Sequence, residues 1–329
     1  MNITLVSLDN LGMNECISSA LEKQGHNVRH INFRDYRYKY PSVFHRVYNF
    51  ILKAFFKKNL KTLHHGKEIL KELEKNHEIQ DVILTIKGDF IDSNSILKFK
   101  KFTKKSIGFF NDNIYRCPKI KRVIPSFDEV YSFEKEDCAN FNLSFAPNWI
   151  YTKNTSSNKE IPAEYGVFNI STIDKRLSTL IRIANELKSK NINFKFIVYD
   201  KKNEPKTGTD GITYINKHVP LSEVNDYADR SKVLLDIHRD GQIGLTFRIF
   251  ESLGLEKKII TTNHDIKNYD FYNPNNILII DKKKPVIPVA FFENEYEKIP
   301  DSILHQYTIE GWCENVILKK AVFKKLSSN

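Results

Sequence analysis

The sequence contains few of the features that mark secreted, metal-binding or membrane-spanning proteins. Its 4 cysteines are scattered over 329 residues without a CxxC pair or metal-ligand spacing, so we expect neither a disulfide scaffold nor a zinc site. No uncharged apolar run approaches the roughly 20 residues that span a bilayer. The segment Met1–Leu8 lacks the basic and long apolar regions of a signal peptide. These absences favour a cytoplasmic protein.

Acidic residues are outnumbered by basic ones, and the net charge is +11. Such a surface attracts polyanions, among them nucleic acid, anionic lipid and nucleotide-activated substrates. The lysines are spread along the chain without a basic tail, so a lysine-rich proteome explains the charge equally well. Hydrophobic residues at 41% and aromatic residues at 12% suffice for packed cores, and the length fits two domains of roughly 150 residues.

Strand and helix patterns alternate through both halves of the chain, which favours parallel sheets with covered faces. We predict an N-terminal domain over residues 1–150 and a polar linker over 151–163. A second domain follows over 164–300, and a helical tail over 301–329 packs back toward the first domain. Predicted strands cover 2–8, 27–32, 82–86, 106–110, 129–132, 144–146, 164–170, 193–199, 212–215, 233–237, 259–262 and 276–281; predicted helices cover 14–24, 135–140, 175–189, 222–230 and 247–253.

The most informative segment is a strand, a polar loop and a helix over residues 233–253. A loop that opens a helix at the carboxyl end of a parallel strand is where open α/β sheets bind ligands. The unpaired N–H groups of the helix N-terminus suit a phosphate. Arg248 could add a bidentate contact to that phosphate or pair with Glu251 instead.

Glu251 could accept the two hydroxyls of a ribose, or it could be an ordinary solvated residue of the same helix. Thr246 is a candidate N-cap that faces the same phosphate. The predicted donor-binding set is therefore His238, Gln242, Gly244, Leu245, Thr246, Arg248 and Glu251.

Several segments together resemble the GT-B fold glycosyltransferases, and among them the spore-maturation (CgeB-like) and lipopolysaccharide or capsule biosynthesis branch. The likeness rests on Gly244–Gly254 with Lys257–Asn263, on Phe109–Asn113, on Tyr131–Ala139 and on Phe145–Pro147. It implies two Rossmann-like, doubly wound α/β domains facing a central cleft, with a nucleotide-sugar donor bound by the second domain. The acceptor would be a glycan or glycolipid, and neither a cofactor nor a metal is expected.

One departure from the family concerns the stereochemistry of transfer. Many retaining members carry two glutamates that flank seven residues at this helix. Counting back from Glu251, the first of the pair would fall on Ile243, which cannot serve. Both the retaining and the inverting outcome therefore remain open.

An inverting transfer needs a base for the acceptor hydroxyl, and two aspartates end predicted strands of the first domain. Asp112 and Asp89 are the candidate catalytic residues, although each could simply cap the following turn. Asn111 and Asn113 flank Asp112, and Gly12 could let the backbone approach an acceptor or a phosphate closely. These three form the predicted acceptor or phosphate loops.

Residues 43–58 combine an apolar helical face with basic residues. One interpretation is a core helix with a solvated basic side. The other is a helix that docks on an anionic membrane surface, where each basic residue contributes roughly 1 kcal/mol. The second interpretation would place the protein at the inner face of the cytoplasmic membrane.

Two other functions remain open from the sequence. A sugar-nucleotide epimerase shares the fold and would need no second substrate. A basic nucleic-acid-binding protein would explain the charge of +11 but not the pocket residues. Because neither a helix-turn-helix nor an RNP-like aromatic pattern occurs, no nucleic-acid partner is expected.

Overall fold

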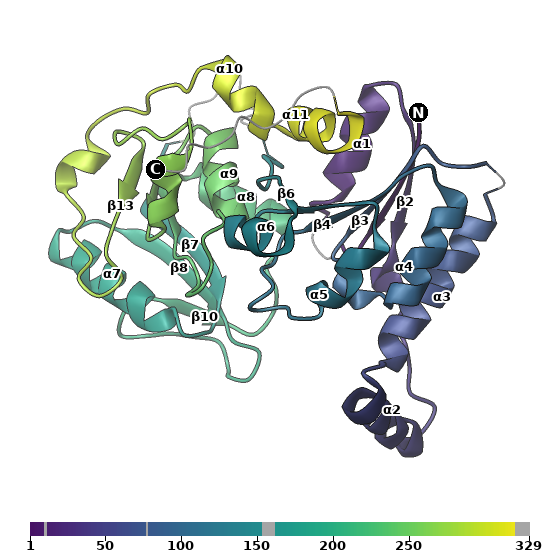
Figure 1. Ribbon diagram of the computed structural model, residues 1–329. Coiled ribbons are helices and arrows are strands. Elements are labelled where there is room, and N and C mark those ends of the chain that lie inside the picture. Colours follow the sequence, from purple (N-terminus) through teal and green to yellow (C-terminus); the bar gives the residue numbers. More distant parts are fainter. Residues whose placement is uncertain (10–11, 77, 153–161, 320–329) are drawn as a thin grey trace. The chain divides into compact units, whose positions relative to one another are not determined.

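A computed structural model describes residues 1–9, 12–76, 78–152 and 162–319 (Figure 1). The chain divides into two compact units. The first contains Met1–Pro147 together with the described part of Ile309–Phe323, and the second contains Asn148–Thr308. Each unit is an α/β layer structure around its own sheet. Within the described ranges, no helix is both long and apolar enough to cross a membrane.

The first unit is built on a six-stranded parallel sheet of order β2-β1-β3-β4-β5-β6. Its strands are β1 Asn2–Ser7, β2 Asn27–Asn32, β3 Val82–Ile86, β4 Ser106–Phe110, β5 Glu129–Ser132 and β6 Ser144–Phe145. Its helices are α1 Glu15–Lys23, α2 Val43–Phe56, α3 Leu60–Glu74, α4 Ser93–Phe99, α5 Ile120–Val123, α6 Lys135–Phe141 and α11 Ile309–Cys313, the last continuing as a π-helical turn over Glu314–Leu318.

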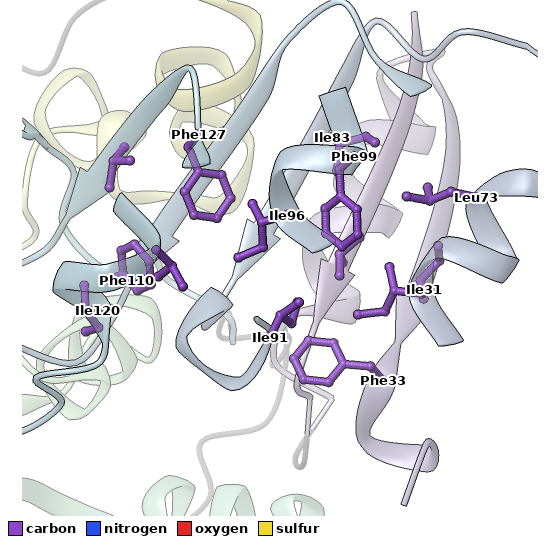
Figure 2. Close-up of a cluster of buried hydrophobic side chains, with 14 of the residues drawn as sticks. Ile31, Phe33, Leu73, Ile83, Ile91, Ile96, Phe99, Phe110, Ile120 and Phe127 are labelled. Atoms are coloured by element: carbon purple, nitrogen blue, oxygen red, sulfur yellow. The ribbon is translucent and has the colours of Figure 1, made fainter. Parts of the chain in front are cut away.

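Helices cover both faces of this sheet, as the wholly buried strands β3 and β4 require. On one face α3, α4 and α5 pack over Ile83 and Phe110 in a continuous apolar cluster (Figure 2). The preceding residue of β4, Phe109, points to the other face and meets Trp312 of α11 edge to face, with ring centroids 5.1 Å apart. Alternation along the strands therefore separates two apolar layers.

The second unit is built on a seven-stranded sheet of order β13-β12-β11-β7-β8-β10-β9, in which only β9 runs antiparallel to its neighbour. Its strands are β7 Tyr165–Thr172, β8 Phe194–Tyr199, β9 Lys206–Thr207, β10 Thr213–Ile215, β11 Ser231–Asp236, β12 Lys258–Thr261 and β13 Ile277–Ile279. Its helices are α7 Leu177–Ser189, α8 Leu221–Asp229, α9 Phe247–Gly254 and α10 Asp301–Leu304.

The two faces of the second sheet are covered by different helices. On one face α7 buries Leu180, Ile183 and Leu187 against β7 and β8. On the other face, the ring of Phe168 from β7 lies 5.6 Å from the ring of Tyr227 in α8. The guanidinium of Arg248 in α9 lies over the same Phe168 ring. A parallel sheet between two helical layers is the doubly wound arrangement that the sequence predicts.

The predicted strands and helices are all present, with boundaries that differ by a few residues. The helices α3 and α4 were not predicted, because their apolar stripes are narrow and interrupted by lysines. The predicted helical tail is broken into α10, a 3-10 turn, α11 and the π-helical turn before Lys319. Most of the predicted linker, residues 153–161, lies outside the described residues.

The core-helix interpretation of residues 43–58 is wrong. Helix α2 has one buried residue, the polar Asn49, whereas its large apolar side chains are exposed apart from the half-buried Leu52. The Asn49 amide explains this inversion, because it donates to the Tyr40 hydroxyl (2.6 Å) and accepts from the backbone N–H of Leu60 (2.8 Å). A polar anchor thus holds α2 to the unit while its apolar residues face outward.

Candidate functional site

In the second unit, the order in which strands are added to the sheet reverses at β7 and β11. These strands are parallel neighbours although α7, β8, β9, β10 and α8 separate them in sequence. The carboxyl ends of two such strands form a crevice that open α/β sheets use for ligands. Here that edge carries Asp174, Arg176 and Arg239. Arg176 donates to both carboxylate oxygens of Asp174 and to the carbonyl of Ile237 (3.0 Å), and Arg239 lies 3.5 Å from Asp174.

This cluster concentrates two guanidinium groups around one carboxylate. Arg176 and Arg239 together shift the pKa of Asp174 below its usual value, although burial opposes them. The cluster keeps a net positive charge because two cations share one anion. Sequence reasoning missed both arginines. The signal that could have found them is their position directly after two strands that turn out to be neighbours.

The loop after β11 is held by Asp236, at the carboxyl end of that strand. Its carboxylate accepts hydrogen bonds from the hydroxyls of Thr246 (2.7 Å) and Thr261 (2.8 Å), so it ties the loop to β12. His238 follows, and its Nδ1 lies 2.9 Å from the Thr262 hydroxyl. Burial lowers the pKa of His238, which favours a neutral imidazole at neutral pH. Asp236 thereby holds the loop in the shape that opens α9.

The rest of the loop is tightly tied to backbone groups. The Gln242 amide donates to the carbonyl of Gly244 (2.9 Å), and the carbonyl of the buried Leu245 accepts from Asn148 (2.9 Å). Thr246 is the N-cap residue of α9, as predicted, but its hydroxyl binds Asp236 and makes no capping hydrogen bond. The first-turn N–H groups of α9 are therefore left without a side-chain cap, which suits an anion.

Helix α9 is positioned by packing at both ends. Trp149, which is fully buried, meets the first residue, Phe247, edge to face with ring centroids 5.0 Å apart. At the other end, a β-carbon at Gly254 would lie 2.0 Å from the carbonyl oxygen of Thr152. Only glycine allows this approach, so both ends of α9 are fixed against the segment 148–152.

Arg248 and Glu251 form an ion pair one turn apart on α9, the alternative that the sequence left open for Arg248. Glu251 is fully buried, and its Oε1 has no hydrogen-bond partner among the described residues. The guanidinium of Arg248 lies 5.4 Å from the ring centroid of Phe168. Glu251 is thus not the solvated helix residue of the second interpretation. It holds one unused acceptor oxygen, and a buried unpaired oxygen of this kind is costly unless a ligand or water satisfies it.

A hollow of about 520 Å³ follows β10 at the same carboxyl edge of the second sheet. It is lined by the loop Asn216–Pro220 and by Glu223 of α8. His218 in this loop stacks on Tyr199 at the end of β8, with ring centroids 4.0 Å apart and planes at 23°. Stacked rings beside an open hollow offer a flat surface to a planar ligand. Nothing in the local sequence pattern pointed to this hollow.

In the first unit, the corresponding reversal lies between β1 and β3. Gly12, after β1, has a φ of +78°, and no atom of the described residues lies within 4 Å of where its β-carbon would be. Its N–H donates to the Asp9 carboxylate (2.8 Å), which also accepts from the N–H groups of Asn14 and Glu15. The positive φ is therefore what requires glycine here, and the N–H groups of Gly12, Asn14 and Glu15 are directed at Asp9.

The two candidate bases differ in their surroundings. Asp112, after β4, is paired with Lys87 (3.4 Å) and Arg116 (2.6 Å). Asp89, in the turn after β3, is described with no ion pair, and burial raises its pKa to about 6. A base with a pKa close to the working pH transfers protons more effectively than a strongly paired carboxylate. The surroundings therefore suit Asp89 better than Asp112.

The two asparagines beside Asp112 also differ from each other. The side-chain oxygen of Asn113 accepts from the backbone N–H of Arg116 (2.9 Å), so Asn113 stabilises the turn after β4. The side-chain oxygen of Asn111 is buried and has no partner in the described part of the chain. Asn111 therefore keeps an acceptor at the carboxyl end of β4. No group of three or more His, Cys, Asp or Glu side chains in the described ranges is arranged to hold a metal ion.

Comparisons with solved structures identify the fold. The chain is similar over its whole length to all of a UDP-forming α,α-trehalose-phosphate synthase from Burkholderia xenovorans, with 10% identity and a TM-score of 0.57. It also matches a UDP-N-acetylglucosamine 2-epimerase at 12% identity (86% and 85% of the two chains; TM-score 0.45). A UDP-glucosyltransferase from Polygonum tinctorium matches at 9% identity (94% and 89%; TM-score 0.44). No protein-family model and no curated protein sequence matches the chain. The predicted GT-B-like fold of two doubly wound α/β domains is confirmed.

Proposed function

We propose that the protein is a glycosyltransferase that moves a sugar from a nucleotide-sugar donor to a glycan acceptor, within the CgeB-like, lipopolysaccharide or capsule biosynthesis branch. The observation that supports it best is the group of features at the carboxyl edge of the second sheet. There, two arginines, an uncapped helix N-terminus and a buried carboxylate oxygen without a described partner all belong to the second of the two units that make up the GT-B-like fold.

The donor would be held by three kinds of contact at this edge. Its diphosphate would bind the first-turn N–H groups of α9 together with Arg176 and Arg239. A ribose hydroxyl would donate to Oε1 of Glu251, whose other carboxylate oxygen is paired with Arg248. The base would occupy the hollow of about 520 Å³ beside His218. Fixed positive groups at the diphosphate would also stabilise the charge that develops as it leaves.

The acceptor would bind the first unit, with Asp89 as the base of an inverting transfer. Asp89 would take the proton of the acceptor hydroxyl while the oxygen bonds to the anomeric carbon. The bond from that carbon to the diphosphate breaks, and the electron pair leaves with the diphosphate. With a pKa raised to about 6, Asp89 is ionised at neutral pH and still basic enough to accept the proton.

Helix α2 would dock the protein on an anionic lipid bilayer that carries the acceptor. Phe44, Phe50 and Phe55 are 85%, 70% and 78% exposed, which is unusual for large aromatic side chains on a monomer. Basic side chains lie in the same helix and directly after it, namely Arg46, Lys53, Lys57 and Lys58. Aromatic residues that enter the headgroup layer beside lysines that meet anionic lipid are the composition of an interfacial helix.

Donor binding can be tested by thermal unfolding with a panel of nucleotides and nucleotide sugars. A ligand at 100 times its Kd stabilises the folded protein by about 2.7 kcal/mol. We expect one nucleotide class to raise the midpoint, and Arg239→Gln to abolish the rise. Arg230→Gln is the matched control, because Arg230 is ion-paired too, but precedes β11 at the amino edge of the sheet. No stabilisation by any nucleotide sugar, or equal loss in both variants, would contradict the proposal.

Transfer itself is then measured with the donor so identified. Release of free nucleotide that depends on an added glycan or glycolipid extract distinguishes a transferase from an epimerase. An epimerase would convert the donor sugar without any acceptor.

A further inference from the structure

A cavity of about 260 Å³ lies in the first unit, beyond the donor features described above. Its wall is formed by the turn between α2 and α3, the turn after β3, the start of α4 and the helix α5. Four basic residues line it: Lys57, Lys58, Lys119 and Arg122. A volume of this size holds a phosphate group together with a few further atoms or waters.

The positive charge of this cavity is only partly balanced by the acidic side chains of its lining. No ion pair is described for any of the four basic side chains, and all four are exposed. Arg122 contributes to the wall by donating to the backbone carbonyl of Lys57 (3.3 Å), which joins α5 to the turn after α2. The two acidic side chains in the lining differ: Asp92 caps α4 through Ser95, and burial raises the pKa of Asp89. Four cations thus face two carboxylates. Oδ1 of Asp92 binds the N–H of Ser95, and its Oδ2 has no partner among the described residues.

The lining of the cavity also includes apolar side chains, and it reaches the end of α2. Phe56, the last residue of that helix, lines the cavity and is 63% exposed, and its neighbour Phe55 is 78% exposed. Figure 1 shows α2 at one end of α3, away from the sheet of the same unit. A ligand that fills this site would therefore place an anionic group among lysines and arginine, and an apolar chain along exposed phenylalanines.

We propose that this cavity binds the phosphate group of an amphiphile, such as a membrane-anchored phosphate, with Lys57, Lys58, Lys119 and Arg122 as its ligands and Phe56 in contact with the apolar chain. Guanidinium and ammonium groups bind phosphate oxygens through short, charge-assisted hydrogen bonds. The identification of this amphiphile with the glycan acceptor rests on the proposed function. The phosphate site itself does not, because it involves no residue of the donor features.

The direct probe is decyl phosphate, a soluble amphiphile with one phosphate, titrated against the full chain in the absence of any nucleotide. We expect saturable binding that Lys119→Gln/Arg122→Gln weakens by about 10- to 100-fold, through the loss of two charge-assisted contacts. The charge-matched control is Lys101→Gln/Lys121→Gln, which removes two exposed lysines of the same unit outside the cavity lining. Equal weakening in the two double variants would overturn the proposal.

Two further arms identify the source of the phosphate. Inorganic phosphate should bind at least tenfold more weakly than decyl phosphate; equal affinity would show that the apolar chain is not recognised. Vesicles with phosphatidic acid should bind the wild type more tightly than phosphatidylserine vesicles of matched zeta potential, and only the cavity variant should lose this preference. No preference in the wild type would mean that α2 senses surface charge alone.

The outcome separates this site from the proposed function. Phosphate binding without any nucleotide-sugar binding would support the cavity and refute the transferase. Conversely, the protein could bind the nucleotide sugar while the cavity variant and its control bind decyl phosphate equally. That result would support the transferase and refute the cavity site. A thermal midpoint for each variant confirms that it is folded before either result is interpreted.

Discussion

Replacing Asp89 by asparagine should stabilise the protein and abolish its turnover. The folded state raises the pKa of Asp89 from the usual 3.8 to about 6, because burial penalises the charged carboxylate. The ionised side chain therefore opposes folding. This contribution is absent below the unfolded value of 3.8, grows as the pH rises, and is complete above about 6. At pH 8 it corresponds to an upper limit of about 3 kcal/mol.

Asparagine has nearly the same shape and carries no charge at any pH. The free energy of unfolding of the Asp89→Asn variant should exceed that of the wild type by up to about 3 kcal/mol at pH 8, and by about 0.6 kcal/mol or less at pH 4. In a scanning experiment the first unit should melt roughly 6–12 °C higher at pH 8. Denaturant titrations of both proteins at the two pH values measure the difference.

Activity and stability should change in opposite directions. In the wild type, kcat/KM should rise with pH through about 6, as a base that must be ionised requires. The asparagine variant should lose turnover while its donor affinity stays unchanged. Asp112→Asn is the control: it breaks contacts with Lys87 and Arg116, so it should destabilise slightly or not at all. Equal stability of wild type and Asp89→Asn at pH 8 would refute the reasoning.

The other predictions concern the donor contacts and α2. Glu251→Ala should weaken nucleotide-sugar binding by about 1–3 kcal/mol, and it leaves Arg248 unpaired; unchanged affinity in a folded variant would exclude Glu251 as a ribose contact. Arg248→Lys can still pair with Glu251 but loses the flat contact over Phe168, so turnover should fall without being lost; full wild-type activity would show that charge alone suffices. Changing Lys53, Lys57 and Lys58 to Gln should reduce sedimentation with anionic vesicles by one to two orders of magnitude, at roughly 1 kcal/mol per charge, and Phe44→Ser/Phe55→Ser should reduce it as well. If both variants sediment with anionic vesicles as strongly as the wild type, the exposed helix α2 has no membrane role.

Much of the fold could be predicted because local patterns and burial agree. Strands such as Val82–Ile86 and Ser106–Phe110 are buried on both faces, so they read as uninterrupted apolar runs in the sequence. The strand, loop and helix over 233–254 were predicted to within two residues, because their patterns are local and the hydrogen bond from Thr246 to Asp236 joins residues ten positions apart. Where chemistry and backbone conformation are decided within about twenty residues, one sequence is enough.

The sequence could not decide which side chains meet across the sheet. Arg176 and Arg239 join at Asp174 because β7 and β11 are neighbours, a pairing between segments about sixty residues apart. Periodicity also could not distinguish burial from exposure in α2: its apolar residues have the spacing of a core helix, yet only Asn49 is buried. The cavity beside α2 arises from four segments that have no local signature in common. Local sequence propensity determines where helices and strands form. The tertiary packing of distant strands and turns determines the charge clusters, buried oxygens and cavities that carry the chemistry.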